Sequence, residues 1–297
     1  MMPDRRQFLA GSSAVLASAC VPLDTSATGR ITSRLRIIEA SAQGTLGAAI
    51  LNTATGAITT YNGAMRFGHC SSFKLSLAAM VLQLDAAGTI DADEQIRWSA
   101  DDLMFVSPFT TRRLEQGASL RELAEYTQKY SDNAAANILL KRLGGPARLT
   151  RFWRALGDQT SRLDRMEPEL GNVPPGEMRD TTTPRAMAQT LATVLYGDAL
   201  PENSRSILKQ WMVDTPTGLD RVRKGLPDTW RAGDKTGTSI WPGMGSLYVD
   251  IGFAEPPSHA PLTFAAYYRA RGTHAAMDPA SLDVLAQVGR VIQSIAR

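Results

Sequence analysis

The pattern of hydrophobic and polar positions predicts a helical middle and strand-rich ends. The run 73–82 is apolar almost all round, which is typical of a buried helix. Ser119 and Glu122 have the spacing of a capping box, which marks the start of another helix. A third helix, predicted over 134–143, stops at a pair of glycines. We therefore expect the chain to be mostly helical from about residue 71 to about residue 214.

Strands are predicted at both ends of the chain. They lie near 45–51, 57–62, 230–237, 245–253 and 262–269. One helix near 31–42 precedes them, and an amphipathic helix follows Pro279. The expected fold class is α+β, with an antiparallel five-stranded sheet covered by helices (30–66 and 215–297, an α/β sandwich) beside an all-α part (67–214). We expect these parts to form one catalytic unit over 30–297.

Composition narrows the function classes. The 297 residues are 43% hydrophobic, which is enough for a substantial core. The formal net charge is +3, and no basic cluster, repeat or low-complexity tract indicates a nucleic-acid partner. We therefore expect a small-molecule substrate and no nucleic-acid partner, and we expect the protein to be a monomer.

The N-terminus resembles an export signal. Arg5 and Arg6 lie in a stretch similar to a twin-arginine signal, and an apolar stretch through Ala19 follows that is too short to span a bilayer. The sequence 17–19 fits a signal-peptidase site, so residues 1–19 are expected to be removed. Cys20 also permits a lipid anchor. The expected location is periplasmic or secreted, with an outer-membrane lipoprotein as the alternative.

Three short motifs carry the candidate chemistry. They are Ser71-Ser72-Phe73-Lys74, Ser131-Asp132-Asn133 and Lys235-Thr236-Gly237. Each supplies a hydroxyl, an ammonium or both, and each alone is common. In this order and at this wide spacing they indicate a serine nucleophile that works without histidine.

The first motif has the geometry that such a nucleophile needs. A serine hydroxyl is weakly nucleophilic at neutral pH until a base takes its proton. Lys74 lies three residues after Ser71, so the two share one face of the predicted helix, near its positive end. Burial and the neighbouring Lys235 would weaken the hold of Lys74 on its proton, which makes it a candidate base.

The other motifs would complete the site. Ser131 is a candidate relay of a proton to a leaving nitrogen, and Asn133 is a candidate ligand for a substrate amide. Lys235 begins a strand segment that can pair with an amide-bearing substrate. The backbone N–H groups of Ser71 and Thr238 are the candidate oxyanion donors, and Gly237 would let a ligand approach the backbone closely.

A charge-dense loop over 162–170 is the most informative segment for telling apart the enzymes that share the three motifs. With the three motifs, it resembles the omega loop of class A β-lactamases, and the resemblance extends from about residue 31 to the end. Mapped onto this chain, it implies Ser71 as nucleophile, Lys74, Ser131 and Asn133 as its partners, Glu167 as the deacylating glutamate, Lys235, Thr236 and Gly237 as the triad, and an ion pair of Arg165 with Asp180 bracing the loop.

The resemblance implies a two-step acyl transfer without cofactor or metal. Ser71 opens the lactam ring to form an ester, and a water activated by Glu167 hydrolyses it. Penicillin-binding proteins lack the water-activating loop. A cell-wall DD-peptidase and a non-enzymatic β-lactam sensor remain as alternatives, and turnover of nitrocefin would separate them from a lactamase.

The chain departs from the family pattern at several positions. Gly171 stands where an asparagine usually helps to hold the hydrolytic water. The strand after the triad strand has no arginine for the substrate carboxylate, so Arg221 is expected to take that part, as in carbapenem-hydrolysing members. Cys70 and Ser239 occupy positions that those members often join by a disulfide, which cannot form here. Ser239 resembles extended-spectrum members, and Thr238 agrees with the carbapenemase pattern.

Overall fold

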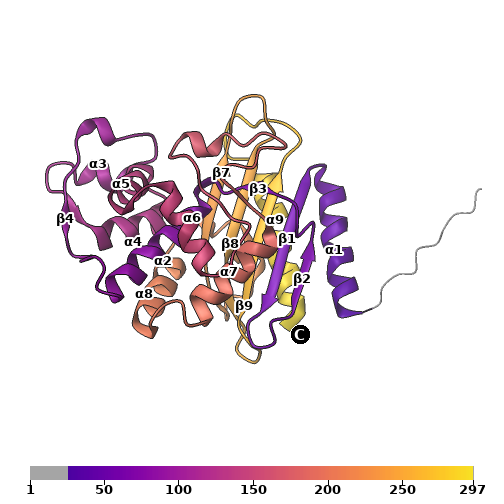
Figure 1. The fold of residues 1–297 in the computed structure, drawn as a ribbon. Coiled ribbons are helices and arrows are strands. Elements are labelled where there is room, and N and C mark those ends of the chain that lie inside the picture. Colours follow the sequence, from indigo (N-terminus) through magenta and orange to yellow (C-terminus); the bar gives the residue numbers. More distant parts are fainter. Residues whose placement is uncertain (1–25, 297) are drawn as a thin grey trace, which may run out of the picture.

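The computed structural model describes residues 26–296. Its centre is a five-stranded antiparallel sheet in the order β2-β1-β9-β8-β7. The strands are β1 (Thr45–Asn52), β2 (Ile58–Tyr61), β7 (Arg231–Ser239), β8 (Leu247–Glu255) and β9 (Leu262–Arg269). Figure 1 shows strands from both ends of the sequence side by side in this sheet. The predicted α+β class with an antiparallel five-stranded sheet is confirmed.

Alternation along the strands gives the sheet two apolar faces, because successive side chains of a strand point to opposite sides. In β1, Leu46, Ala48 and Ile50 belong to the core under α1 (Ala27–Ala42) and α9 (Pro279–Gln293). Ala49 and Leu51 belong to the larger core shared with the central helices. The sheet is therefore covered on both faces, and α1 and α9 lie together on the outer one (Figure 1).

The rest of the chain is mainly helical. Its helices are α2 (Phe73–Ala86), α3 (Pro108–Arg112), α4 (Leu120–Tyr130), α5 (Asn133–Leu143), α6 (Pro146–Ala155), α7 (Pro184–Tyr196) and α8 (Glu202–Val213). Two-residue strands form small ladders: β3 (Phe67–Gly68) with β6 (Thr181–Thr182), and β4 (Gln95–Ile96) with β5 (Ala118–Ser119). The residues of 73–82 are all buried, as the apolar run predicts, so α2 forms the centre of the helical part.

Local signals in the sequence explain several helix ends. The Ser119 side chain accepts from the N–H of Glu122 and the Glu122 side chain accepts from the N–H of Ser119, which completes the predicted capping box. Gly144 ends α5 with a φ of 97°, a left-handed conformation that glycine adopts without strain. Between the two helices, Ser131 caps the end of α4 and Asp132 caps the start of α5, so the second motif forms their connection.

The N-terminal predictions fall outside the described residues. The expected signal peptide, residues 1–19, and the alternative lipid anchor at Cys20 therefore stay predictions. Within 26–296, no helix combines the length and the apolarity needed to cross a membrane.

Candidate active site

The nucleophile candidate lies just before a helix rather than inside it. Cys70–Ser72 form a short 3-10 turn, and α2 begins at Phe73. The sequence predicts Ser71 in the first turn of the helix. The structure places it instead in the 3-10 turn that precedes α2. Cys70 has a φ of 46°, a left-handed conformation that costs a non-glycine residue about 1–3 kcal/mol. Ser71 follows this strained residue directly and lines the cleft.

Lys74 is the centre of the polar cluster. Its buried ammonium donates to Ser71 Oγ at 2.9 Å and to the Ser131 carbonyl oxygen at 2.9 Å. It also donates to Asn133 Oδ1 and lies 3.0 Å from Glu167 Oε1. Ser71 Oγ is itself 3.5 Å from Glu167 Oε1. One ammonium therefore connects the hydroxyl to the carboxylate, and either group can exchange a proton with Ser71.

Asp132 makes the second motif rigid. Its buried carboxylate accepts from the N–H groups of Phe109, Thr110 and Ala135, so it joins α3 to the start of α5. The residue before it, Ser131, has a φ of 59° and ends α4. The tripeptide is thus fixed at both ends, and it holds the Ser131 hydroxyl at the cleft.

Asn133 is more occupied than a free substrate ligand would be. Its Oδ1 accepts from Lys74, and its Nδ2 donates to the Phe105 carbonyl oxygen at 3.0 Å. The side chain still lines the cleft. In this arrangement Asn133 orients Lys74 and the 105–106 segment, and a substrate amide would have to share these groups.

The triad strand β7 lies directly against the nucleophile turn. A Cβ at Gly237 would come within 2.9 Å of the His69 carbonyl oxygen and 3.0 Å of the Ser71 nitrogen. Glycine is therefore needed for close approach of the strand to the turn, whereas the sequence suggested close approach of a ligand. The result is that the backbone of β7 and the N–H of Ser71 face one small space.

Lys235 extends the polar cluster from β7. Its buried ammonium donates to Ser131 Oγ at 3.1 Å and to the Thr236 carbonyl oxygen at 2.8 Å. Burial, together with the charges of Lys74 and Arg221, holds the pKa of Lys235 well below its usual range. Ser131 thus lies between two ammonium groups, and a proton can pass through its hydroxyl.

Arg221 reaches the opposite side of the cleft but is nearly all buried. Its guanidinium donates to the carbonyl oxygens of Gly237 and Val249 and to Thr238 Oγ1 at 2.7 Å. Burial lowers the pKa of this guanidinium. Arg221 therefore fixes the β7 backbone and the Thr238 hydroxyl. Only a small exposed part of the Arg221 side chain lines the cleft.

The loop that carries Glu167 is held by two sets of contacts. Asn137 accepts from the Glu167 N–H at 3.0 Å and donates to the Glu167 carbonyl oxygen at 2.9 Å. Arg165 and the buried Asp180 form the expected ion pair at 2.5 Å. Arg165 also donates to the Asn172 carbonyl oxygen. These contacts position the Glu167 carboxylate over Ser71.

Gly171 and Ser239 connect the same loop to β7. The Ser239 hydroxyl donates to the Gly171 carbonyl oxygen at 2.7 Å. Beside this contact lies an apolar cavity of about 590 Å³, whose lining includes Phe105, Ile240 and Trp241. Cys70 is a buried free thiol, and Ser239 stands where the family disulfide would need a second cysteine.

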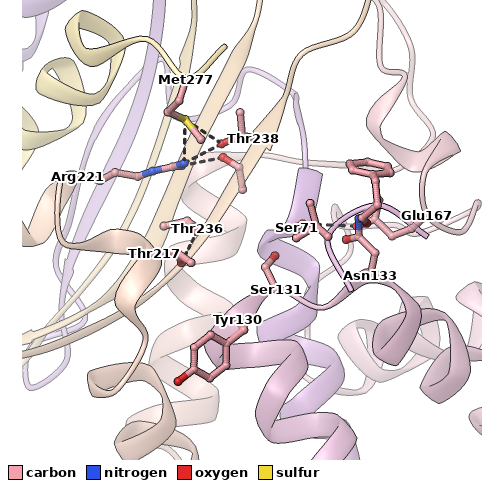
Figure 2. A pocket seen from close by; sticks show the side chains of 13 residues that line it. Ser71, Tyr130, Ser131, Asn133, Glu167, Thr217, Arg221, Thr236, Thr238 and Met277 are labelled. Atoms are coloured by element: carbon pink, nitrogen blue, oxygen red, sulfur yellow. Dashed lines mark hydrogen bonds between the residues drawn. The ribbon is translucent and has the colours of Figure 1, made fainter. Parts of the chain in front are cut away.

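These groups surround a cleft of about 250 Å³. Figure 2 shows Ser71, Asn133 and Glu167 on one side of it and Arg221, Thr236 and Thr238 on the other. The motifs and the resemblance thus predicted residues that the structure brings together; Lys74 and Lys235 lie just below the surface of the cleft. Arg165 and Asp180 lie behind it.

Sequence reasoning missed other residues of the cleft. Tyr130, Thr217 and Met277 line it, and Thr217 Oγ1 is 2.8 Å from Thr236 Oγ1. Asn137 supports Glu167 from below. Its place four residues after Asn133, on the same face of α5, is a signal that could have found it. Thr217 lies in a 3-10 turn (Pro216–Gly218) and Met277 in an irregular segment, and neither position carries such a signal.

In the part of the chain that the structure describes, no three His, Cys, Asp or Glu side chains gather closely enough to hold a metal ion. The available chemistry is that of hydroxyls, ammonium groups and one carboxylate around a pair of backbone N–H groups. This set can acylate a serine and hydrolyse the ester.

Comparison with known proteins identifies the family of this chain. Residues 30–295 match the model of the Beta-lactamase enzyme family. β-Lactamase OXY-2 of Klebsiella oxytoca is 40% identical over 241 residues, 81% of this chain and 82% of the relative. β-Lactamase Toho-1 of Escherichia coli is 39% identical over 79% of each chain.

Solved structures agree. An ancestral class A β-lactamase superimposes with a TM-score of 0.84 at 44% identity, covering 89% of this chain and 99% of that one. A β-lactamase from Xanthomonas campestris superimposes with a TM-score of 0.85 at 38% identity, covering 92% and 99%.

Proposed function

The chain belongs to the class A β-lactamase family, and on that premise we propose that it hydrolyses its substrates through an acyl-enzyme on Ser71. Enzymes of this kind hydrolyse β-lactams and thereby cause antibiotic resistance. The observation that carries the mechanism is the position of Lys74. Its ammonium contacts both Ser71 Oγ, at 2.9 Å, and Glu167 Oε1, at 3.0 Å.

In the first step, Ser71 Oγ attacks the lactam carbonyl carbon. The new C–O bond forms an ester, and the lactam C–N bond breaks. The proton of Ser71 goes to Lys74 or Glu167, since both lie within reach of Ser71 Oγ. The leaving nitrogen takes a proton through Ser131, whose hydroxyl contacts Lys235 and Lys74.

Backbone N–H groups would stabilise the charge that develops on the carbonyl oxygen. Those of Ser71 and Thr238 are the donors, because Gly237 allows β7 to pack against the Ser71 turn. Removal of one such donor costs about 10²–10³ in kcat in other acyl-transfer enzymes. The N-terminal end of α2 adds a favourable dipole at the same place.

In the second step, Glu167 takes a proton from a water that attacks the ester carbon. The ester C–O bond breaks, and Ser71 regains its proton. Asn137 holds the backbone of Glu167, and Arg165 with Asp180 holds the loop. Gly171 contributes no side chain to this water, so Glu167 and Ser71 are its polar partners on this side.

The substrate carboxylate would lie on the opposite side of the cleft. Lys235 supplies a positive charge there, and Thr236 and Thr238 supply hydroxyls. Arg221 positions Thr238 and contributes its charge from behind. The apolar cavity near Ser239 and Trp241 would receive the substituent on the acyl side of the lactam.

Intact-protein mass spectrometry with benzylpenicillin tests both steps. Wild type should turn over without a stable adduct, Ser71→Ala should show no adduct, and Glu167→Ala should accumulate one. Glu169→Ala is the matched control, because Glu169 is an exposed carboxylate on the same loop. Full turnover by the Glu167 variant would remove Glu167 from deacylation. A single adduct on wild type, without turnover, would favour the DD-peptidase or sensor alternatives.

We also propose that the enzyme is exported through the twin-arginine route and works in the periplasm. The pair Arg5-Arg6 before a short apolar stretch supports this. Replacing both arginines by lysine should trap precursor in the cytoplasm, and normal export would favour the general secretory route. The mass of the mature N-terminus distinguishes cleavage after Ala19 from a lipid on Cys20. Light scattering tests the expected monomer.

A further inference from the structure

A second cavity, separate from the catalytic cleft, lies under the C-terminal part of the same loop. Its volume is about 400 Å³, within the size range of small-molecule sites. Thr45 at the start of β1 and Arg269 at the end of β9 line it, as do Met65–Phe67 and the loop segment 173–178. None of these residues lines the catalytic cleft or the apolar cavity beside it.

Two guanidinium groups line this cavity without an acidic partner among residues 26–296. Arg66 donates to the Thr160 carbonyl oxygen and to Thr181 Oγ1. Arg269 donates to the carbonyl oxygens of Gly245 and Val173, both at 3.2 Å. A guanidinium has five N–H groups, so each of these arginines keeps donors that the described residues do not use.

The one carboxylate in the lining does not neutralise them. Glu177 forms its ion pair with Arg179, at 2.6 Å, and accepts from the N–H groups of Met178 and Arg179. The lining therefore carries a net positive charge, and Arg179 adds a further one beside it. Arg66 and Arg269 are partly buried and form no ion pair with a described residue. Burial therefore lowers the pKa of both guanidinium groups.

The remainder of the lining is apolar. Phe67 and Val173 form buried wall, Pro174 and Pro175 lie on the loop side, and two methionines are exposed at the rim. Met65 is 43% and Met178 is 46% exposed, which places both among the few large exposed hydrophobic side chains of the described chain. Methionine side chains adapt to ligands of varied shape.

From this juxtaposition we propose that the cavity binds a small organic acid, with its carboxylate on Arg66 and Arg269 and an apolar body against Met65, Met178 and the prolines. Guanidinium groups match a carboxylate in geometry and charge. The occupant would lie against Val173, whose carbonyl oxygen accepts from Arg269. The site does not depend on the acyl-enzyme mechanism, because no residue of that mechanism lines it.

Isothermal titration with 4-phenylbutyrate and its neutral amide tests the proposal. The acid should bind saturably and at least about tenfold more tightly than the amide, since the amide cannot form the charge-assisted pairs. Met65→Glu places a competing carboxylate at the rim and should weaken binding of the acid at least about tenfold. Met178→Glu is a second variant of the same kind. Ile37→Glu on α1 is the matched control, since Ile37 is equally an exposed apolar residue.

Nitrocefin hydrolysis should be retained by all three variants, which shows that each has folded. Acid bound in the catalytic cleft instead would be insensitive to Met65→Glu. Equal affinities for acid and amide, unchanged affinity in both rim variants, or no saturable binding by wild type would each overturn the proposal.

Discussion

The hydroxyl of Ser239 and the carbonyl oxygen of Gly171 form a hydrogen bond of 2.7 Å that joins the triad strand to the loop carrying Glu167. Gly171 and Ser239 both line the apolar cavity beside the catalytic cleft. A Cβ built there would meet only Ser239 Oγ at 3.6 Å and Trp241 at 3.9 Å, both ordinary contacts. A Cβ at 171 therefore fits without moving the backbone.

We predict that Gly171→Asn speeds deacylation and narrows the substrate range. An amide at 171 adds one hydrogen bond to the attacking water, worth about 0.5–1.5 kcal/mol, or roughly 2- to 12-fold in rate. The same side chain would take space from the apolar cavity, so kcat/KM for the bulkiest oxyimino-cephalosporins should fall. Pre-steady-state kinetics with a carbapenem and such a cephalosporin measure both effects. Gly171→Ala is the control, since it fills space without a polar group. Equal deacylation rates in all three proteins would show that other groups set the water position.

Arg221→Ala should lower both activity and stability. Loss of a charge-assisted contact costs about 1.5–3 kcal/mol, roughly 10- to 150-fold in kcat/KM. The carbonyl oxygens of Gly237 and Val249 would also lose a buried donor, at about 1–3 kcal/mol each in unfolding free energy. Thermal melts and steady-state kinetics separate the two effects. A substrate and its methyl ester provide the control: the ester should lose less. Unchanged kcat/KM on several substrates would remove Arg221 from carboxylate recognition.

The sequence predicted most of what local pattern determines. The strand predicted near 262–269 is β9, and the capping box located the start of α4. The nucleophile, its lysine and the triad came from motifs whose chemistry requires them. The resemblance added Glu167, together with the ion pair of Arg165 and Asp180.

What the sequence could not predict depends on long-range packing. The carbonyl oxygens that accept from the Arg221 guanidinium come from β7 and β8, which pair beside it, and no local pattern states which of them it will meet. Thr217 enters the cleft from a short 3-10 turn and Met277 from an irregular segment, and neither the helical nor the strand period of apolar residues marks these positions. The close packing of Gly237 against Ser71 likewise depends on how β7 docks against the turn before α2.

Lys235 should set an alkaline limit to activity. Burial and the charges of Lys74 and Arg221 lower its pKa well below the usual range, so its ammonium loses charge in the folded enzyme as the pH rises through that lowered value. The attraction for the substrate carboxylate then falls, and kcat/KM should decline on the alkaline side. Lys235→Arg keeps a permanent charge and should flatten this limb, whatever its activity at neutral pH. Lys141→Arg, at an exposed position, is the control and should follow wild type. An alkaline limb that is the same in Lys235→Arg would assign it to another group.

His69 should make the enzyme less stable in acid. The imidazole is buried and stacks on Trp153 with ring centroids 4.8 Å apart. Burial lowers its pKa to about 4; the charges of Asp180 and Asp158 oppose that shift, and Arg66 adds to it. The unfolded chain takes up the proton near pH 6.5. The free energy of unfolding therefore receives the full contribution of the neutral imidazole above about pH 6.5. This contribution falls as the pH drops towards 4, by about 3 kcal/mol in total.

His69→Phe keeps the stacking but cannot take up a proton, so its unfolding free energy should fall less over this range by about that amount. Urea unfolding at pH 7, 5.5 and 4 measures the difference, and His259→Phe, at an exposed position, is the matched control. If His69→Phe and wild type lose stability in parallel, the acid sensitivity arises from the carboxylates of the loop.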